Sequence, residues 1–227
     1  MSEISRDGVH LMFDEISKTY DRANHVMTFG LDRYWRKALR KFLPNNARLL
    51  DMATGTGDQI VSLIDHVDSA VGIDLSEEML SIGRKKCARY GDKVRLETGN
   101  ALKVDYPDAS FDAITMSFGI RNVTDTRGCL KEMRRLLKPG GRALILEGGN
   151  IDIPIIRGLH LFYMRQVLPR IGAFVSGHNS AYRYLNQTIE SYPYGSQFSE
   201  LMRSCGFKDV KAHPMMLGSV YIYVGSS

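Results

Sequence analysis

An arginine and an asparagine stand side by side in the stretch SFGIRNVTD, residues 117–125, directly after a run of apolar residues. That run, residues 111–118, is predicted to be a buried strand, so Arg121 and Asn122 follow its carboxyl end. In an open α/β sheet, ligands bind at this end of the strands. A guanidinium and an amide there can orient a substrate oxygen and stabilise a developing anion. The alternative is local: Arg121 pairs with Asp125, and Asn122 caps the next helix.

A second group of polar residues surrounds a glycine-containing turn, TGTGD, after a strand that carries Asp51. Gly55 and Gly57, with Thr56 between them, let a ligand approach the backbone closely, and the following helix offers free N–H groups. Asp74 stands nineteen residues after Gly55, at the end of the next predicted strand. A carboxylate there can accept hydrogen bonds from both hydroxyls of a ribose, so the pattern predicts a nucleoside-containing cofactor.

The same turn favours S-adenosylmethionine (SAM) over a dinucleotide. A dinucleotide turn has a third glycine where this chain has Ile60. Asp51 would repel a pyrophosphate, whereas it suits a ligand that carries an amino group or a sulfonium. Asn100 and Ala101, after the third predicted strand, can reach an adenine edge through the side-chain amide and the backbone. The alternative for Asp51 and Asp74 is helix capping, and Asn100 is also a typical turn residue.

Strands and helices alternate through the central part of the chain. Alternation at these lengths implies parallel βαβ units and therefore a doubly wound, mostly parallel seven-stranded α/β sheet. Ser76 is the expected cap of the second helix of this series, and an antiparallel hairpin around Leu217 and Gly218 is expected to finish the sheet. The expected strands are residues 48–53, 70–75, 94–98, 111–118, 142–147, 210–216 and 219–224, and the expected helices are residues 57–66, 76–90, 125–137 and 198–205.

Two further helical regions are expected outside this alternation. Apolar residues at helical spacing from Val9 to Tyr20 predict an N-terminal helix, followed by a turn-rich link over residues 24–35 and a basic helix that ends near Phe42. Residues 151–195 form a long apolar insertion that is predicted to be helical. We expect a single domain over residues 1–227 with four parts: an N-terminal cap (1–43), a cofactor-binding core (44–150), a substrate-cap insertion (151–195), and a final helix and hairpin (196–227).

The composition excludes several classes of protein. The chain has 227 residues, of which 44% are hydrophobic and 24% charged, as in an ordinary globular domain. Cys87, Cys129 and Cys205 lie far apart, so neither a disulfide framework nor a metal site is expected. The net charge of +5 is not concentrated around the predicted site, so nucleic acid is not an expected partner. Without an apolar leader or a long apolar run, the sequence predicts a soluble cytoplasmic protein.

Five stretches of the chain are similar to one known family: FDEISKTYDRANHVMTFGLDRYWR, LDMATGTGD, SFGIRNVTD, LKPGG and YRYLNQTIESYP. The second and fourth occur across many SAM-dependent methyltransferases, whereas the other three are far more specific. Over nearly its full length the chain resembles the ubiquinone/menaquinone biosynthesis C-methyltransferase family. The resemblance implies a class I SAM-dependent methyltransferase fold and the methylation of demethylmenaquinol. A ubiquinol precursor, or another phenolic or lipid acceptor, is the alternative substrate.

The resemblance also implies site residues. It carries the SAM contacts of the family to Thr56, Asp74, the pair Asn100–Ala101 and Ser117. The chain departs from the family at three places: at Thr54, where the family usually has glycine and a threonine requires a negative φ, at residues 148–152, and in the tail over residues 223–227.

Methylation of a quinol ring requires removal of a hydroxyl proton, exclusion of water and positioning of the ring. We expect Arg121 and Asn122 to orient the quinol oxygen or a water, with Arg121 stabilising the phenolate. Tyr182 and Tyr184 are rival proton handlers and candidate substrate contacts, although tyrosines in an apolar cap are often packing residues. The apolar insertion can line a channel for a prenyl tail.

A substrate dissolved in a bilayer implies transient contact with the inner face of the membrane. A homodimer is compatible with the sequence, which does not give the oligomeric state. Two other classes of function stay open. One is a SAM-dependent methyltransferase that acts on a sterol, a small phenol or RNA, and the other is a non-enzymatic SAM-binding or quinone-carrier protein.

Overall fold

A seven-stranded sheet forms the centre of the computed structural model, which describes residues 8–177 and 179–227. The strand order is β3-β2-β1-β4-β5-β7-β6. The first five strands of this order pair in parallel, and β7 is antiparallel to β5 and β6. The predicted doubly wound sheet with a terminal hairpin is therefore confirmed. The strands are β1 (Ala47–Met52), β2 (Val67–Asp74), β3 (Val94–Thr98), β4 (Phe111–Ser117), β5 (Leu137–Gly148), β6 (Lys208–Met215) and β7 (Val220–Ser226).

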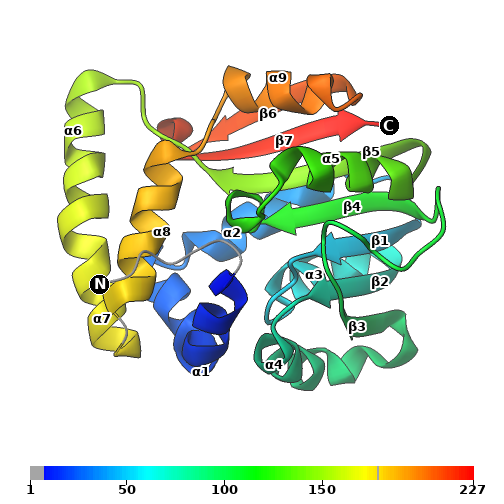
Figure 1. Ribbon diagram of the computed structural model, residues 1–227, viewed down its shortest axis with the longest axis horizontal. Helices are drawn as coiled ribbons and strands as arrows, with labels where there is room; N and C mark the ends of the chain where they lie inside the picture. Colours follow the sequence, from blue (N-terminus) through cyan, green and yellow to red (C-terminus); the bar gives the residue numbers. More distant parts are fainter. Residues whose placement is uncertain (1–7, 178) are drawn as a thin grey trace.

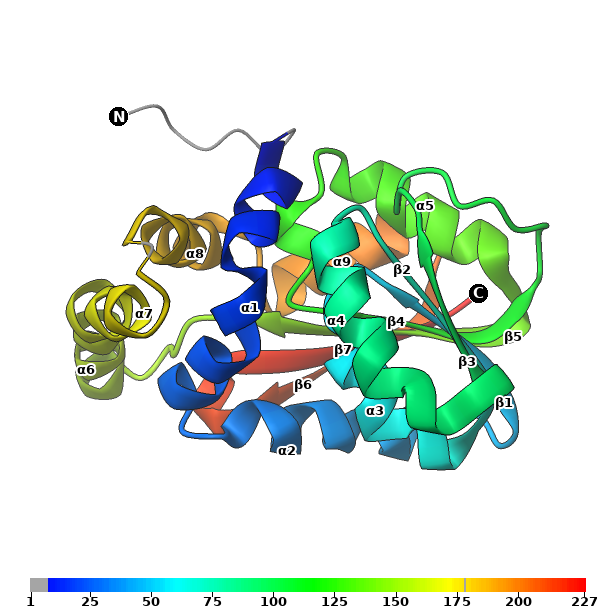
Figure 2. The ribbon, with the colours of Figure 1, turned by 90° about the horizontal axis from the view of Figure 1, so that it is seen from below.

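The α-helices are α1 (Val9–Met27), α2 (Leu31–Ala38), α3 (Asp58–Leu63), α4 (Glu77–Cys87), α5 (Thr126–Leu136), α6 (Pro154–Phe162), α7 (Leu168–Ser176), α8 (Asn179–Ser191) and α9 (Ser196–Ser204). Figure 2 shows α2 and α3 on one face of the sheet and α5 and α9 on the other. Because side chains of a strand alternate between its faces, Leu50 and Met52 pack toward α5 and α9, whereas Leu49 packs toward α2 and α3.

Local capping explains where two of these helices begin. Ser76 caps α4 as predicted, since its Oγ accepts a hydrogen bond from the Met79 N–H at 3.1 Å. Asp125 caps α5 in the same way and accepts from the Gly128 N–H at 2.9 Å. The Lys-Pro-Gly-Gly stretch ends α5 but is not a free loop. Strand β5 already begins at Leu137, which pairs with Phe111 before the register shifts.

The predicted turn-rich link over residues 24–35 is wrong. Helix α1 continues to Met27, and α2 begins at Leu31. The whole link is one tight turn, in which Gly30 adopts the left-handed conformation (φ 75°) and its N–H donates to the His25 carbonyl at 2.7 Å. A glycine adopts this conformation without steric cost, so a single residue can replace the longer loop.

Helix α1 and helices α6–α8 stand beyond the carboxyl ends of the parallel strands, toward which the arrows of β4 and β5 point (Figure 1). These helices share an apolar core of their own, which includes Ile16, Met27, Leu168 and Ala181. The predicted helical insertion is confirmed, with a π-helical segment (Tyr163–Val167) between α6 and α7. Within the described ranges, no helix is long and apolar enough to span a membrane.

Candidate functional site

A cavity of about 230 Å³, called here the cofactor cavity, lies at the carboxyl ends of β1–β4. It is lined partly by polar groups that the sequence singled out. Gly55, Asp74, Asn100, Ala101 and Ser117 all contribute to its wall. The strand ends therefore bring together five predicted residues that are spread over more than sixty positions of the chain.

Asp74 is held by the backbone of the glycine turn. Its Oδ2 accepts a hydrogen bond from the Gly55 N–H at 2.8 Å, and its Oδ1 accepts from the Ser76 N–H at 2.9 Å. Burial raises the pKa of this carboxyl, and the backbone hydrogen bonds oppose the rise. Each carboxylate oxygen has a second lone pair, so a fixed Asp74 can still accept from the hydroxyls of a ribose.

Asp51 does not line the cofactor cavity. Only 1% of the residue is exposed, and both carboxylate oxygens accept hydrogen bonds at 2.6 Å, from the hydroxyls of Thr54 and Thr115. Burial raises the pKa of Asp51 to about 6, against the effect of these two hydroxyls. Asp51 thus acts on the site through its charge and through its hydrogen bond to Thr54, at the start of the glycine turn. The φ of Thr54 is not positive, which is the condition for a threonine at this position.

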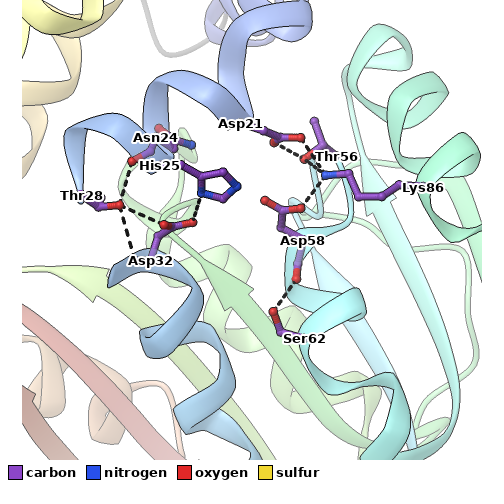
Figure 3. A network of polar contacts seen from close by, with 9 residues as sticks. All are labelled: Asp21, Asn24, His25, Thr28, Asp32, Thr56, Asp58, Ser62 and Lys86. Atoms are coloured by element: carbon purple, nitrogen blue, oxygen red, sulfur yellow. Dashed lines mark hydrogen bonds and ion pairs between the residues drawn. The ribbon is translucent and has the colours of Figure 1, made fainter. Parts of the chain in front are cut away.

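Thr56 and Gly57 also lie outside the cavity wall. The Thr56 hydroxyl donates to Asp21 of α1 at 2.6 Å, and the Lys86 ammonium approaches both Thr56 (3.1 Å) and Asp21 (2.7 Å) (Figure 3). Lys86 also binds Asp58 at the start of α3. These contacts connect α1 to the glycine turn. Thr56 therefore helps to position the N-terminal helix next to the cofactor cavity.

The other cofactor candidates have mixed surroundings. The Oδ1 of Asn100 accepts from the Leu102 N–H at 2.9 Å, so the turn role that the sequence left open is present. In the described part of the chain, its amide nitrogen donates no hydrogen bond, so it can serve a ligand in the cavity. Ser117 donates its hydroxyl proton to Oε1 of Gln59 at 2.7 Å, which fixes the hydroxyl at the cavity wall.

Two non-glycine residues with left-handed backbone border the cofactor cavity. Ala53 follows β1 with φ 53°, and Phe118 follows β4 with φ 58°. Such residues cost about 1–3 kcal/mol each and cluster at functional sites. A Cβ at Gly119 would come within 2.8 Å of the Ala53 Cβ, so these two strand ends pack too closely for any other residue there.

A second cavity of about 250 Å³, called here the cap cavity, lies between the sheet and helices α1, α2 and α6–α8. Most of its wall is apolar, from residues such as Met12, Ile16, Met164 and Leu185. The predicted residues Arg121, Asn122 and Tyr184 line it. Tyr182 also belongs to α8, but its side chain lies outside the described part of the structure.

Arg121 pairs with Glu147 rather than with Asp125. Its Nη1 lies 2.5 Å from Oε1 of Glu147, and both side chains are almost fully buried. The alternative role for Asn122, capping of the next helix, is also wrong, because Asp125 caps α5 and the amide of Asn122 approaches the Phe118 carbonyl at 3.5 Å. Within the described ranges, Arg121 Nε, Asn122 Oδ1 and Glu147 Oε2 have no hydrogen-bond partner.

The two cavities share a wall. Four residues line both of them: Phe13, Tyr20, Phe118 and Asn122. Burial raises the pKa of the Tyr20 phenol, while the charges of Arg36 and Arg121 lower it. A hydroxyl group placed beside Tyr20 is exposed to the same two positive charges.

His160 brings an imidazole into the mostly apolar wall of the cap cavity. Its Nε2 is buried and meets no hydrogen-bond partner among the described residues. Burial lowers the pKa of His160, and the charge of Glu190 opposes this effect. The neutral imidazole is therefore favoured, and a neutral imidazole can accept a proton.

One group of side chains within the described ranges could also hold a metal ion. The ligand atoms of His25, Asp32 and Asp58 all lie within 4.8 Å of one another (Figure 3). However, the Lys86 ammonium lies 2.5 Å from Asp58 Oδ1, and the Thr28 hydroxyl donates to Asp32 at 2.9 Å. The carboxylates are thus already engaged within the chain, and we assign no metal to them.

Three residues of the site are not predicted from the sequence: Tyr20, Glu147 and His160. Glu147 ends the fifth predicted strand, which lies next to the strand that precedes Arg121. The pairing of these two strands would have predicted that Arg121 and Glu147 lie close together. The sequence pattern indicates only that Tyr20 belongs to the apolar face of the N-terminal helix. His160 carried no signal, because only the packing of the insertion brings it to the cavity.

Comparisons with known proteins agree with this architecture. The model of the ubiE/COQ5 methyltransferase family matches residues 1–227. A protein from Geotalea daltonii named ubiquinone/menaquinone biosynthesis C-methyltransferase UbiE is 41% identical over 222 residues, with 94% of each chain covered. A demethylmenaquinone methyltransferase from Chlorobaculum parvum is 37% identical, with 98% of this chain and 93% of that protein covered.

Solved structures show the same fold at low sequence identity. A SAM-dependent methyltransferase from Thermotoga maritima superposes with a TM-score of 0.66 at 20% identity, covering 94% of this chain and 97% of that one. The [4+2]-cyclase SpnF also gives 0.66, at 15% identity, covering 100% and 98%. Because a cyclase shares the fold, the fold alone does not assign the reaction.

Proposed function

Because this chain belongs to the ubiE/COQ5 methyltransferase family, we propose that it transfers a methyl group from SAM to a ring carbon of demethylmenaquinol. The family and the fold make it a SAM-dependent methyltransferase, and the names of its relatives suggest the quinol. A ubiquinol precursor is the second candidate substrate, because the name of the Geotalea relative includes ubiquinone. The observation that carries the proposal is a cavity partly lined by polar groups, Asp74 among them, that shares a wall with a mostly apolar cavity.

The reaction needs a nucleophilic ring carbon. SAM, when bound, supplies an electrophilic methyl group on a sulfonium. Loss of the hydroxyl proton leaves an electron pair on the quinol oxygen, which makes the adjacent ring carbon nucleophilic. SAM held beside Asp74 would supply the methyl group to that carbon, with the electrons of the sulfur–methyl bond staying on sulfur, and the ring carbon would release its proton to water to restore aromaticity. The shared wall is where ring and methyl donor would meet, away from water.

Asn122 is proposed to orient the quinol oxygen or a water beside it. It lines both cavities, and its Oδ1 has no hydrogen-bond partner in the described part of the chain. Arg121 is proposed to add positive charge beside the same oxygen. Its pairing with Glu147 weakens that charge, so its main contribution is to hold the strand end in place.

His160 is proposed to accept the hydroxyl proton. Its unpartnered Nε2 faces an apolar cavity, and its lowered pKa keeps the ring neutral at physiological pH. Replacing His160 by glutamine should lower turnover about 100-fold without changing SAM affinity. Unchanged turnover would remove His160 from this role.

The remaining wall of the cap cavity is proposed to hold the prenylated part of the substrate. Tyr184 lines this cavity together with apolar residues of α1 and α6–α8, and Tyr182 is proposed as a second contact from the same helix. The N-terminal residues 1–43 and the insertion over residues 151–195 would then serve as the substrate cap of a single domain, with residues 44–150 as its cofactor-binding core and residues 196–227 completing the sheet.

Membrane contact is part of the same proposal, because a prenylated quinol resides in a bilayer. Large apolar side chains of α6 and α7 are exposed, as are those of two turns next to the cap cavity. Phe174 is 92% exposed and Ile155 89% exposed. Such residues can enter the headgroup region transiently, at the cytoplasmic face of the membrane. The exposed residues are Phe29, Ile153, Ile155, Leu159, Phe162, Phe174, Met216 and Leu217.

The activity is tested with purified protein, labelled SAM, and demethylmenaquinol beside a demethoxyubiquinol-type acceptor. We expect label in the ring of demethylmenaquinol, and turnover about 100-fold lower for Asn122→Ala with SAM affinity within threefold of wild type. Methylation of the ubiquinol precursor alone would move the assignment to the second candidate. SAM binding without transfer to either acceptor, or to a sterol or RNA, would indicate a carrier.

The membrane contact is tested by flotation with anionic vesicles. The wild-type protein should float, and the double variant Ile155→Glu, Phe174→Glu should not. Tyr34→Glu, at a residue that is 60% exposed on α2, serves as the control and should float. No flotation of the wild type would refute the contact.

A further inference from the structure

A second arginine, Arg36 of α2, is buried in the wall of the cap cavity without a partner for its charge. The residue is 8% exposed. In the part of the chain that the structure describes, its side-chain nitrogens form no hydrogen bond or ion pair, and its Nε is fully enclosed. Only its backbone carbonyl is engaged, by the Gln59 amide at 3.3 Å. Buried guanidinium groups are normally paired, so this one implies an anion that binds there.

The carboxylates near Arg36 are engaged elsewhere. Asp51, whose raised pKa the charge of Arg36 opposes, accepts hydrogen bonds from two threonine hydroxyls. Asp32, one helical turn earlier, lies 2.8 Å from the His25 ring and accepts from the Thr28 hydroxyl. Glu147, the acid at the end of β5, pairs with Arg121. The charge of Arg36 is therefore available to a ligand, whereas that of Arg121 is largely neutralised.

The position of Arg36 indicates which ligand it meets. It lines the cap cavity, and also a separate cavity beside α2 and α3, but not the cofactor cavity. Its guanidinium carbon lies 5.5 Å from the centre of the Phe118 ring, which belongs to the shared wall, and this contact places it at the cap cavity. Among the charges that lower the pKa of the Tyr20 phenol, Arg36 is the strongest and Arg121 follows. A phenolic oxygen at this wall thus lies in the field of an unpaired cation.

We propose that Arg36 binds the oxygen of the acceptor as it becomes a phenolate. This rests on the proposed function, since the anion is the quinol after its O–H bond has broken and the proton has left. The guanidinium donates N–H groups to the oxygen, where the electron pair stays until the ring carbon takes the methyl group. Arg36, rather than Arg121, then supplies the positive charge for the reaction.

The direct test is the binding of two naphthols that differ in charge. 4-Nitro-1-naphthol is largely ionised at pH 8 and absorbs visible light, and 1-naphthol is neutral at that pH. Arg36→Gln should bind the nitronaphtholate about 10–100-fold more weakly than wild type, and 1-naphthol equally well. Arg36→Lys should recover part of the loss. Arg40→Gln, an exposed arginine on the following turn, is the control and should behave as wild type. Equal loss for both naphthols would overturn the proposal.

Stability and cofactor binding separate this role from a structural one. Removing an unpaired buried charge should not destabilise the ligand-free protein, so Arg36→Met should keep or raise its melting temperature. Its turnover should fall about 100-fold, with SAM affinity within threefold of wild type. A lower melting temperature would indicate a packing role. A tenfold loss of SAM affinity with normal nitronaphtholate binding would assign Arg36 to the cofactor carboxylate instead. Because naphthol binding requires no turnover, it stays informative even if the methyl acceptor is another phenol.

Discussion

The cofactor cavity and the cap cavity meet along one wall but are built in different ways. The cofactor cavity is formed by turns at the ends of β1–β4, and its polar groups are held by short-range hydrogen bonds such as that from Gly55 to Asp74. The cap cavity lies between the sheet and helices α1, α2 and α6–α8, and the charged side chains in its wall, Asp32, Arg36 and Arg121, are buried. The first cavity is therefore preorganised by local backbone geometry, whereas the second depends on long-range packing and buried charge.

The largest expected effect concerns the buried ion pair beside the cap cavity. Arg121→Met leaves the buried Glu147 carboxylate without its ion-pair partner and with one backbone hydrogen bond from Gly148, so the free energy of unfolding should fall by about 3–5 kcal/mol in urea denaturation. Adding Glu147→Leu should recover most of this loss. Arg203→Met breaks the exposed pair with Glu200 and one hydrogen bond to the Val210 carbonyl, and should cost about 1–2 kcal/mol. Similar losses for Arg121→Met and Arg203→Met would show that burial does not distinguish this region.

The second prediction concerns Asp51, beneath the cofactor cavity. Its folded pKa of about 6 lies above the unfolded value of 3.8, so the folded state holds this proton more tightly. The contribution of Asp51 to the free energy of unfolding is fully present below pH 4. It falls by about 3 kcal/mol as the pH rises through 6. Asp51→Asn removes the ionisation, so its unfolding free energy relative to wild type should increase by that amount between pH 4 and pH 7. A constant difference over this range would contradict the raised pKa.

A third prediction separates the two cavities by their ligands. Asp74→Asn should weaken SAM binding by about 10–100-fold in calorimetry, because hydrogen bonds to a carboxylate contribute about 1.5–3 kcal/mol. Leu185→Ala, in the wall of the cap cavity, should leave SAM affinity within about threefold of wild type. If Leu185→Ala weakened SAM binding as much as Asp74→Asn, the two cavities would not be separate binding sites.

The smallest effect concerns the glycines that follow β5. A Cβ at Gly149 would lie 2.7 Å from the Tyr221 ring, so Gly149→Ala should lower the free energy of unfolding by about 1–3 kcal/mol. Nothing lies within 4 Å of a Cβ at Gly158 of α6, where alanine should stabilise the protein by about 0.5–1 kcal/mol. Thermal denaturation of the two variants compares them directly, and equal shifts would show that the close approach does not exist.

The same contrast explains what the sequence could predict. The cofactor cavity depends on residues within a few positions of strand ends, so the strand pattern alone pointed to Gly55 and Asp74, whereas Ser117 followed from the family resemblance. The strand pattern did not predict that Asp51 lies outside the cavity wall, where both of its oxygens accept from threonine hydroxyls, one of them sixty-four positions away. The cap cavity depends on how α1 and α2 pack against the insertion, which periodicity does not specify. Arg36 therefore looked like any other basic residue of a surface helix.

The shared wall of Phe13, Tyr20, Phe118 and Asn122 has a thermodynamic consequence. A ligand that orders these four side chains from one cavity also prepares the surface that the other ligand contacts. Binding in the two cavities is then coupled, and the coupling is reciprocal: each ligand raises the affinity for its neighbour by the same factor. The methyl donor and its acceptor would then bind as a cooperative pair, so that the complete ternary complex is more populated than two independent affinities would give.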